Sequence, residues 1–271
     1  MRPPDLFDAD LLARRRARAA RLGLADFLQQ AAADEILDRL AEVNRTFRDA
    51  AVITPWPGLW AERLGALAPR MVPEAETLDL APESLDLVIH ALGLHWANDP
   101  VGQIVQCRRA LRPDGLFLGA LFGSRTLQEL RAALAEAEAE ETGGISPRVA
   151  PMGEIRDLGG LLQRAGFALP VADAVTLEAS YADGMALMRD LRAMGETNVM
   201  HDRLRRPTAR RVLARAAAIL AERFAGPDGR VRATYEIVFL TGWAPAPGQQ
   251  KPLKPGSATH RLADALKPQT D

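Results

Sequence analysis

The chain has 271 residues, of which 48% are hydrophobic, and its 34 basic residues nearly balance 35 acidic ones to give a formal net charge of −1. This length and composition support a globular protein with one large core, which needs neither a metal nor disulfides in order to fold. A charge so close to zero provides no bulk field that would attract nucleic acid or anionic lipid, so neither partner is predicted.

Cysteine usage and the lack of long apolar runs indicate the compartment. The lone Cys107 cannot form an internal disulfide, which fits a reducing environment. No apolar run approaches the roughly 18 residues of a membrane span, and the N-terminus lacks the apolar core of a secretory signal. We therefore expect a cytoplasmic protein without a membrane span.

The first segment, residues 1–48, is predicted to be a helical lead-in. Apolar residues recur at helical spacing between Leu28 and Phe47, and polar residues occupy the other face. An arginine cluster precedes them, and it consists of Arg14, Arg15, Arg16, Arg18 and Arg21. Mitochondrial presequences are also rich in arginine, but the three nearby aspartates are atypical of such signals. We interpret the arginines as a solvated helix face.

Three short apolar runs are predicted to be buried strands. They are residues 50–53 (AAVI), 85–92 (LDLVIHAL) and 115–122 (GLFLGALF), and proline or glycine turns follow or precede them. Apolar residues at helical spacing between positions 101 and 111 predict a helix between the last two strands. Because buried strands that alternate with helices form parallel sheets covered on both faces, the fold class is α/β.

The second half is predicted to add helices and two further strands. The alternating stretch VADAVTLEA, residues 171–179, predicts a strand, and residues 231–243 predict the last one. Two helices between them form an insert over about residues 182–225. We expect residues 49–244 to form the main domain and residues 245–271, which are rich in proline, to be a flexible tail.

The middle of the chain resembles the class I methyltransferases that use S-adenosylmethionine. In that superfamily an acidic residue opens the fourth strand and a Pro-Asp-Gly turn precedes the fifth, as in residues 85–122 here. The phrases LHWANDP, GGISPRVAPMGEIRDLGGLLQRAGF, LMRDLRAMGETN and PDGRVRATYEIVFLTGW further resemble one subfamily, the bacterial relatives of the mitochondrial complex I assembly factor described as an arginine hydroxylase. That subfamily is similar to malonyl-acyl-carrier-protein methyltransferases. The resemblance implies a Rossmann-like sheet of seven strands, with the last strand antiparallel and helices inserted before it.

The sequence departs from this family in the loop after the first strand. The family carries Asp-Leu-Gly-Cys-Gly-Thr-Gly or a close variant there, because glycines let backbone amides approach the cofactor's methionine part and the acid meets its amino group. Aligned on Gly58, this chain places Val52 at the acid, and Thr54 and Trp56 at the first two glycines. Their β-carbons obstruct close approach, and two adjacent prolines remove amide donors. The sequence therefore predicts a degenerate cofactor loop.

The stretch after this loop is shorter than in the family. One helix's worth of residues leads into residues 70–88 (RMVPEAETLDLAPESLDLV), which match the family's third strand and the approach to its fourth. The resemblance then implies that one strand-helix unit is missing, together with the acid that binds the ribose hydroxyls. It places Glu74 and Ala75 at the adenine-contacting pair. We expect Trp56 and Trp60 to fill the vacated cleft.

A remnant of the cofactor pocket is predicted, although no residue is assigned a catalytic role. The predicted remnant consists of Gly58, Glu74, Ala75 and His95. His95 follows the fourth strand at its carboxyl end, where open α/β sheets place ligands, so it is a candidate acid or base. The alternative is that its imidazole caps the following helix or packs beside Trp96. His90 and His201 have no ligand set near them in the sequence, and no metal site is predicted.

Two hypotheses about function follow. The first is a methyltransferase-like pseudoenzyme that does not bind S-adenosylmethionine and acts through a protein partner, with a complex I subunit or assembly factor expected by resemblance. The second is an active enzyme with an altered pocket, either a methyltransferase of the malonyl-acyl-carrier-protein kind or a protein arginine hydroxylase. The altered loop and the missing strand favour the first. The surviving phrases GGISPRVAP, LMRDLRAMGETN and QQKPLKPGSAT either carry recognition or pack the helical insert over the sheet.

Overall fold

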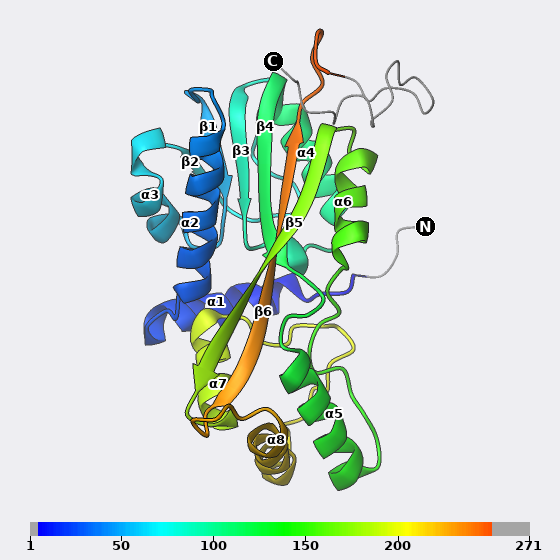
Figure 1. Cartoon of the computed structure of the whole chain (residues 1–271). Coiled ribbons are helices and arrows are strands. Elements are labelled where there is room, and N and C mark those ends of the chain that lie inside the picture. Colours follow the sequence, from blue (N-terminus) through cyan, green and yellow to red (C-terminus); the bar gives the residue numbers. More distant parts are fainter. Residues whose placement is uncertain (1–4, 251–271) are drawn as a thin grey trace, which may run out of the picture.

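The computed structural model describes residues 5–250, and within them six strands form a single sheet in the order β2-β1-β3-β4-β6-β5 (Figure 1). The strands are β1 (Ala50–Ile53), β2 (Arg70–Val72), β3 (Leu85–Ala91), β4 (Leu111–Phe122), β5 (Ala168–Tyr181) and β6 (Val231–Trp243). Strands β2, β1, β3 and β4 are parallel, whereas β6 is antiparallel to both of its neighbours. The predicted α/β class and the antiparallel last strand are confirmed.

The sheet is one strand short of the seven that the resemblance implies. The three-residue strand β2 pairs directly with β1, with Val52 opposite Met71, and the short helix α3 (Pro57–Arg63) connects them. No further strand lies beyond β2 among residues 5–250. The expected loss of one strand-helix unit is therefore confirmed, and it leaves β2 at the edge of the sheet.

Helices cover both faces of the parallel strands because most side chains on both faces of these strands are apolar. Val52 and Ile89 face α2 (Phe27–Glu42), whereas Ala51 and Val88 face the layer that contains α4 (Pro100–Ala110) and α6 (Ile155–Arg164). Proline at the first position and the Asp99 carboxylate, which accepts a hydrogen bond from the Gly102 amide, begin α4. Two short 3-10 helices, Gly65–Leu67 and Leu94–Trp96, complete the connections.

The antiparallel strands β5 and β6 extend past the parallel strands into a separate helical layer (Figure 1). Three helices gather around that extension, namely α5 (Gln128–Thr142), α7 (Gly184–Met194) and α8 (Arg210–Arg223). Helices α7 and α8 lie between β5 and β6 in the chain, where the insert is predicted. Residues 245–250 form neither helix nor strand, and the rest of the predicted flexible tail lies outside the described residues.

A buried ion pair fastens the segment after α5 to the insert. The Glu138 side chain is 6% exposed, and it accepts hydrogen bonds from the Ser146 amide at 2.9 Å and from Arg148 Nε at 3.1 Å. Arg148 also donates to Thr208 Oγ1, just before α8. The Arg148 hydrogen bond holds the pKa of Glu138 at about 2 against the opposing effect of burial. The phrase GGISPRVAP thus packs the insert, which supports the structural alternative for it.

The N-terminal helix α1 (Ala9–Leu22) crosses the molecule between the parallel strands and the insert (Figure 1). Its buried residues Leu12, Arg16 and Ala19 share one helical face, and Gly23 ends the helix at a φ of 94°. The interpretation of all five arginines as solvated is therefore wrong for Arg16, which faces inward at 8% exposure.

The single cysteine contributes to the core on the α4 side of the sheet. Cys107 is fully buried, and burial raises the pKa of its thiol to about 12. At neutral pH the side chain is therefore a small apolar group.

Candidate functional site

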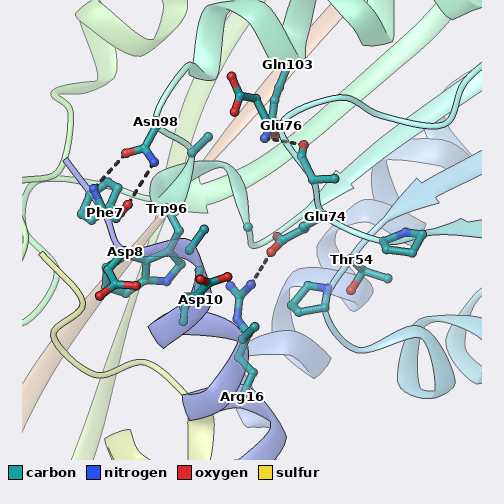
Figure 2. Close-up of a pocket in the computed structure, with 18 of the residues that line it drawn as sticks. Phe7, Asp8, Asp10, Arg16, Thr54, Glu74, Glu76, Trp96, Asn98 and Gln103 are labelled. Carbon is teal, nitrogen blue, oxygen red and sulfur yellow. Dashed lines mark hydrogen bonds and ion pairs between the residues drawn. The ribbon is translucent and has the colours of Figure 1, made fainter. Parts of the chain in front are cut away.

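A cleft of about 1010 Å³ lies between α1 and the carboxyl ends of β1, β2 and β3. The loops that follow these three strands form one side, and small side chains of α1, including Ala13 and Ala17, form the other. Open α/β sheets bind ligands at this edge, where the strand order reverses. Figure 2 shows part of this lining, with Arg16 extending from α1 toward Glu74.

The loop after β1 offers a ligand no free backbone donor from Thr54 to Pro57. The Thr54 amide donates to the Val72 carbonyl at 3.1 Å, and the Trp56 amide donates to Thr54 Oγ1 at 3.0 Å. Pro55 and Pro57 have no N–H group. The amides of this loop are thus occupied by hydrogen bonds within the protein, unlike those of a glycine-rich loop, which point at a bound group.

The two tryptophans of this region have different roles. Trp56 is 8% exposed and lines the cleft, as expected. Trp60 is fully buried away from the cleft, where its Nε1 donates to Gln29 Oε1 of α2 at 2.9 Å. The prediction that both rings fill the cleft is wrong, because Trp60 belongs to the helical layer and the cleft keeps its volume.

Glu74 lies immediately beyond β2, with its carboxylate over Gly93. A Cβ at position 93 would overlap this carboxylate, so the glycine makes room for it. Since β2 is the direct neighbour of β1, Glu74 stands where doubly wound folds place the acid that meets ribose hydroxyls. This placement revises the adenine-pair assignment and the inference that the ribose acid was lost with the missing strand.

Arg16 connects Glu74 to a second partly buried acid, Glu196, which follows α7. Its Nη1 forms an ion pair with Glu74, and its Nη2 lies 3.8 Å from Glu196 Oε1. Several buried atoms here lack a hydrogen-bond partner, among them Arg16 Nε, Glu74 Oε1 and Glu196 Oε1. The helical spacing of Leu12, Arg16 and Ala19 signals the burial of Arg16, whereas nothing near Glu196 in the sequence signals its role.

His95 lies behind the cleft and is not among the residues that line it. Its side chain is 4% exposed, with Nε2 at 3.3 Å from Glu196 Oε2. Its ring centroid lies 4.6 Å from that of Phe122, with the two planes tilted by 51°. Trp96 Nε1 donates to the same carboxylate oxygen. Burial alone would raise the pKa of Glu196, but the contacts with His95, Arg16 and Trp96 outweigh burial and lower it. The packing alternative describes His95 better than the acid-base one.

The other predicted pocket residues are divided between the cleft and its surroundings. Ala75 lines the cleft and its carbonyl accepts a hydrogen bond from Gln103, which also contacts buried His90. Gly58 is exposed and does not line the cleft. His201 does line it, but no group of three metal-binding side chains occurs within residues 5–250.

These residues do not fit S-adenosylmethionine in the way the resemblance implies. The chain has no acid at Val52, offers no free amide between Thr54 and Pro57, and holds Glu74 in an ion pair with Arg16. The cleft has room for a ligand of that size, but the loop after β1 does not supply the acid and the free amides that orient the methionine part in the family.

Comparison with known proteins identifies the family. The family profile described as "Methyltransferase domain" matches residues 40–119. The chain is 34% identical to Homo sapiens "Arginine-hydroxylase NDUFAF5, mitochondrial" over 285 residues, which cover 94% of the chain and 81% of that protein. The Danio rerio protein of the same name is 40% identical over 197 residues, or 72% of the chain and 60% of the relative. "Malonyl-[acyl-carrier protein] O-methyltransferase" of Halorhodospira halophila is 31% identical over 276 residues, covering 90% and 91%.

A solved structure supports the fold. The BH2331 protein of Bacillus halodurans has a TM-score of 0.50 at 12% identity, and the match covers 78% of this chain and 98% of that one. Among residues 5–250, no helix is both long and apolar enough to cross a membrane. The cytoplasmic location stays a prediction. The chain belongs to the family of methyltransferase-fold proteins that includes arginine-hydroxylase NDUFAF5 and malonyl-acyl-carrier-protein O-methyltransferase.

Proposed function

We propose that this protein is a noncatalytic member of its family that acts by binding a protein partner, with a subunit or assembly factor of respiratory complex I as that partner. The observation that carries the proposal is the loop after β1, in which no backbone amide from Thr54 to Pro57 is free for a ligand. A cofactor loop works through such amides, so their loss removes the orienting contacts.

Two further features support it. Arg16 pairs with Glu74, so binding a ribose there first requires that this ion pair open. His95, the candidate acid or base, faces Glu196 and Phe122 instead of the cleft. Neither feature prevents the protein from holding a partner, because surface recognition needs no free group in the cleft.

Titration of the purified chain with S-adenosylmethionine and S-adenosylhomocysteine tests the first half of the proposal. We expect no saturable heat at physiological cofactor concentrations, because each lost charged hydrogen bond weakens binding by roughly 1.5 to 3 kcal/mol. A low-micromolar dissociation constant would overturn it. The double variant Thr54→Gly/Trp56→Gly is also expected not to bind S-adenosylmethionine, since both prolines and the Arg16–Glu74 pair remain.

Affinity purification of the full chain tests the second half. We expect recovery of a complex I subunit or assembly factor, and weaker recovery when residues 249–271 are deleted. Arg148 is unsuitable as a probe of recognition because it pairs with buried Glu138. As a control, the melting temperature of the deletion variant must stay within a few degrees of that of the full chain.

An active enzyme with an altered pocket remains the second candidate, and the cleft of about 1010 Å³ favours it. Glu74 also keeps the sheet position from which an acid meets ribose. Mass spectrometry of candidate substrates incubated in air with the protein and S-adenosylmethionine distinguishes the two. A new methyl group on the free carboxylate of a malonyl-acyl-carrier-protein thioester, or a new hydroxyl group on a protein arginine, would establish catalysis.

A further inference from the structure

The outward face of α1 is covered with arginines. Arg14, Arg18 and Arg21 are three or four residues apart and lie on one side of the helix, with Arg15 beside them. All four side chains are exposed, in contrast to Arg16 on the inner face. The helix therefore presents a row of positive charge to solvent along its length.

Helix α7 packs against α1 (Figure 1). The linker after α1 is fixed to α7 by a hydrogen bond from the Ala25 amide to the Ala193 carbonyl, at 3.2 Å. Two further exposed arginines, Arg189 and Arg192, lie on α7 close to that bond. We define the arginine face as Arg14, Arg15, Arg18, Arg21, Arg189 and Arg192.

None of the six side chains forms an ion pair or a side-chain hydrogen bond with any residue between 5 and 250. The nearest acids along the chain are Asp10 and Asp26 for the arginines of α1, and Asp190, which accepts a hydrogen bond from the Tyr181 hydroxyl, for those of α7. A formal net charge of −1 for the whole chain thus conceals a segregated cationic surface. Like charges left unpaired on one face repel one another, and external anions relieve that repulsion.

Two partly exposed apolar side chains form a corner beside Arg21, and the ring of one of them, Phe27, also packs edge-on against Tyr235. Leu22 ends α1 and is 66% exposed, and Phe27 begins α2 and is 38% exposed. Both flank the linker that contacts α7. Exposed apolar groups beside a basic cluster are typical of peripheral proteins, which insert such groups among lipid headgroups.

We propose that the arginine face docks on an anionic membrane surface, with guanidinium groups on headgroup phosphates and Leu22 inserted beneath them. Arginine suits phosphate because its planar group donates two parallel hydrogen bonds. The apolar corner favours lipid over nucleic acid, whose backbone offers no apolar layer. This inference is independent of the proposed noncatalytic function. Since α1 also walls the cleft, docking would hold the cleft beside the bilayer.

Co-sedimentation of the full chain with vesicles tests the proposal. We expect binding to vesicles of phosphatidylcholine mixed with phosphatidylglycerol, weak binding to phosphatidylcholine alone, and loss of binding as added salt shortens the range of the charges. The variant Arg14→Ala/Arg18→Ala/Arg21→Ala is expected to bind the anionic vesicles roughly 100-fold less tightly, since each basic residue contributes about a factor of five.

A matched variant controls for net charge. Arg109, Arg156 and Arg164 are exposed on α4 and α6, on the other side of the sheet, so Arg109→Ala/Arg156→Ala/Arg164→Ala removes the same charge elsewhere. Its affinity for anionic vesicles is expected to stay within about threefold of the natural protein. Leu22→Ser tests the apolar corner and is expected to weaken binding roughly tenfold with an unchanged melting temperature.

Three outcomes would overturn the proposal. They are equal losses in the two triple variants, equally tight binding to neutral and anionic vesicles, and an absence of vesicle binding with retention on double-stranded DNA. The last outcome would assign the face to nucleic acid. Circular dichroism of each variant establishes that the compared proteins are folded.

Discussion

Helices α1 and α8 are both rich in arginine, but only α8 pairs exposed arginines with acids of the described chain. On α8, Arg211 and Arg215 pair with Glu141 and Glu140 of α5, at 3.1 and 2.6 Å. The outward arginines of α1 have no such partners within the described residues. The same residue type therefore closes a seam between two helices in one region and leaves a surface open to external anions in the other. The presence of an acid within reach, and not the number of arginines, decides whether an arginine joins two helices or stays available to an external anion.

The largest loss of stability is expected at the buried ion pair between Arg148 and Glu138 of α5. Replacing Arg148 with alanine leaves the Glu138 carboxylate, which is 6% exposed, without its cation. Removing one partner of a buried pair costs roughly 3 to 5 kcal/mol of unfolding free energy. Urea denaturation measures this change. A loss below about 1 kcal/mol would mean that water reaches Glu138 and that the pair is effectively at the surface.

The acid stability of the protein should depend on the same carboxylate. The pKa of Glu138 is about 2 in the folded state against an ordinary value of 4.5, so the folded state binds fewer protons between these values. The stability it contributes is complete above about pH 4.5 and is lost as the pH falls toward 2. The loss should total roughly 3 kcal/mol. Glu138→Gln is expected to flatten this part of the stability profile, and an unchanged slope would contradict the assignment.

On the α1 side, only Arg16 should affect stability. Its removal leaves Glu74 without a cation, but Glu74 borders the cleft and can be hydrated there, and Glu196 keeps its contacts with His95 and Trp96. We expect Arg16→Ala to cost about 2 kcal/mol of unfolding free energy, less than Arg148→Ala. Arg18→Ala is the matched control on the same helix. Equal stabilities for the two variants would show that the inner position of Arg16 contributes nothing.

The smallest changes in stability are expected for the exposed arginines, and they should differ between α8 and α1. Arg223 has a side chain that is 55% exposed and pairs with Glu136, so Arg223→Ala should lose between about 0.2 and 1 kcal/mol. Arg14→Ala or Arg21→Ala should change stability by less than about 0.5 kcal/mol in either direction, because no internal partner is lost. Thermal melts at low and high salt measure both. A clear loss for the α1 variants would reveal internal partners and remove the contrast.

The sequence predicts much of the sheet, because its buried strands are nearly continuous apolar runs. Residues 50–53 form β1 over their full predicted length, and the run at 85–92 differs from β3 by one residue. The start of β4 differs more, since Leu111 already pairs with Leu85 before the turn at Asp114. Strand pairing across the sheet, rather than local apolarity, sets that boundary.

The site is less predictable, because its contacts join residues that are distant in the chain. The position of the cleft follows from the carboxyl ends of the strands, which the apolar runs already locate. The Arg16–Glu74 pair spans 58 residues, and it depends on how α1 packs against the insert. The direction of Trp60 similarly depends on the rotation of α3 against α2, which brings its ring to Gln29. Neither relation leaves a local pattern.

Chemical labelling of the buried Cys107 thiol can measure how often part of the structure opens. An alkylating reagent attacks only the thiolate, and this thiol has a pKa of about 12 and no exposed surface. Labelling in native buffer must therefore wait until α4 separates from the sheet, so the labelling rate reports the free energy of that event alone. If the opening free energy obtained from labelling exceeds that obtained from amide exchange in α7 and α8, the sheet and the insert open as separate cooperative units. Equal opening free energies would show that the two layers unfold together.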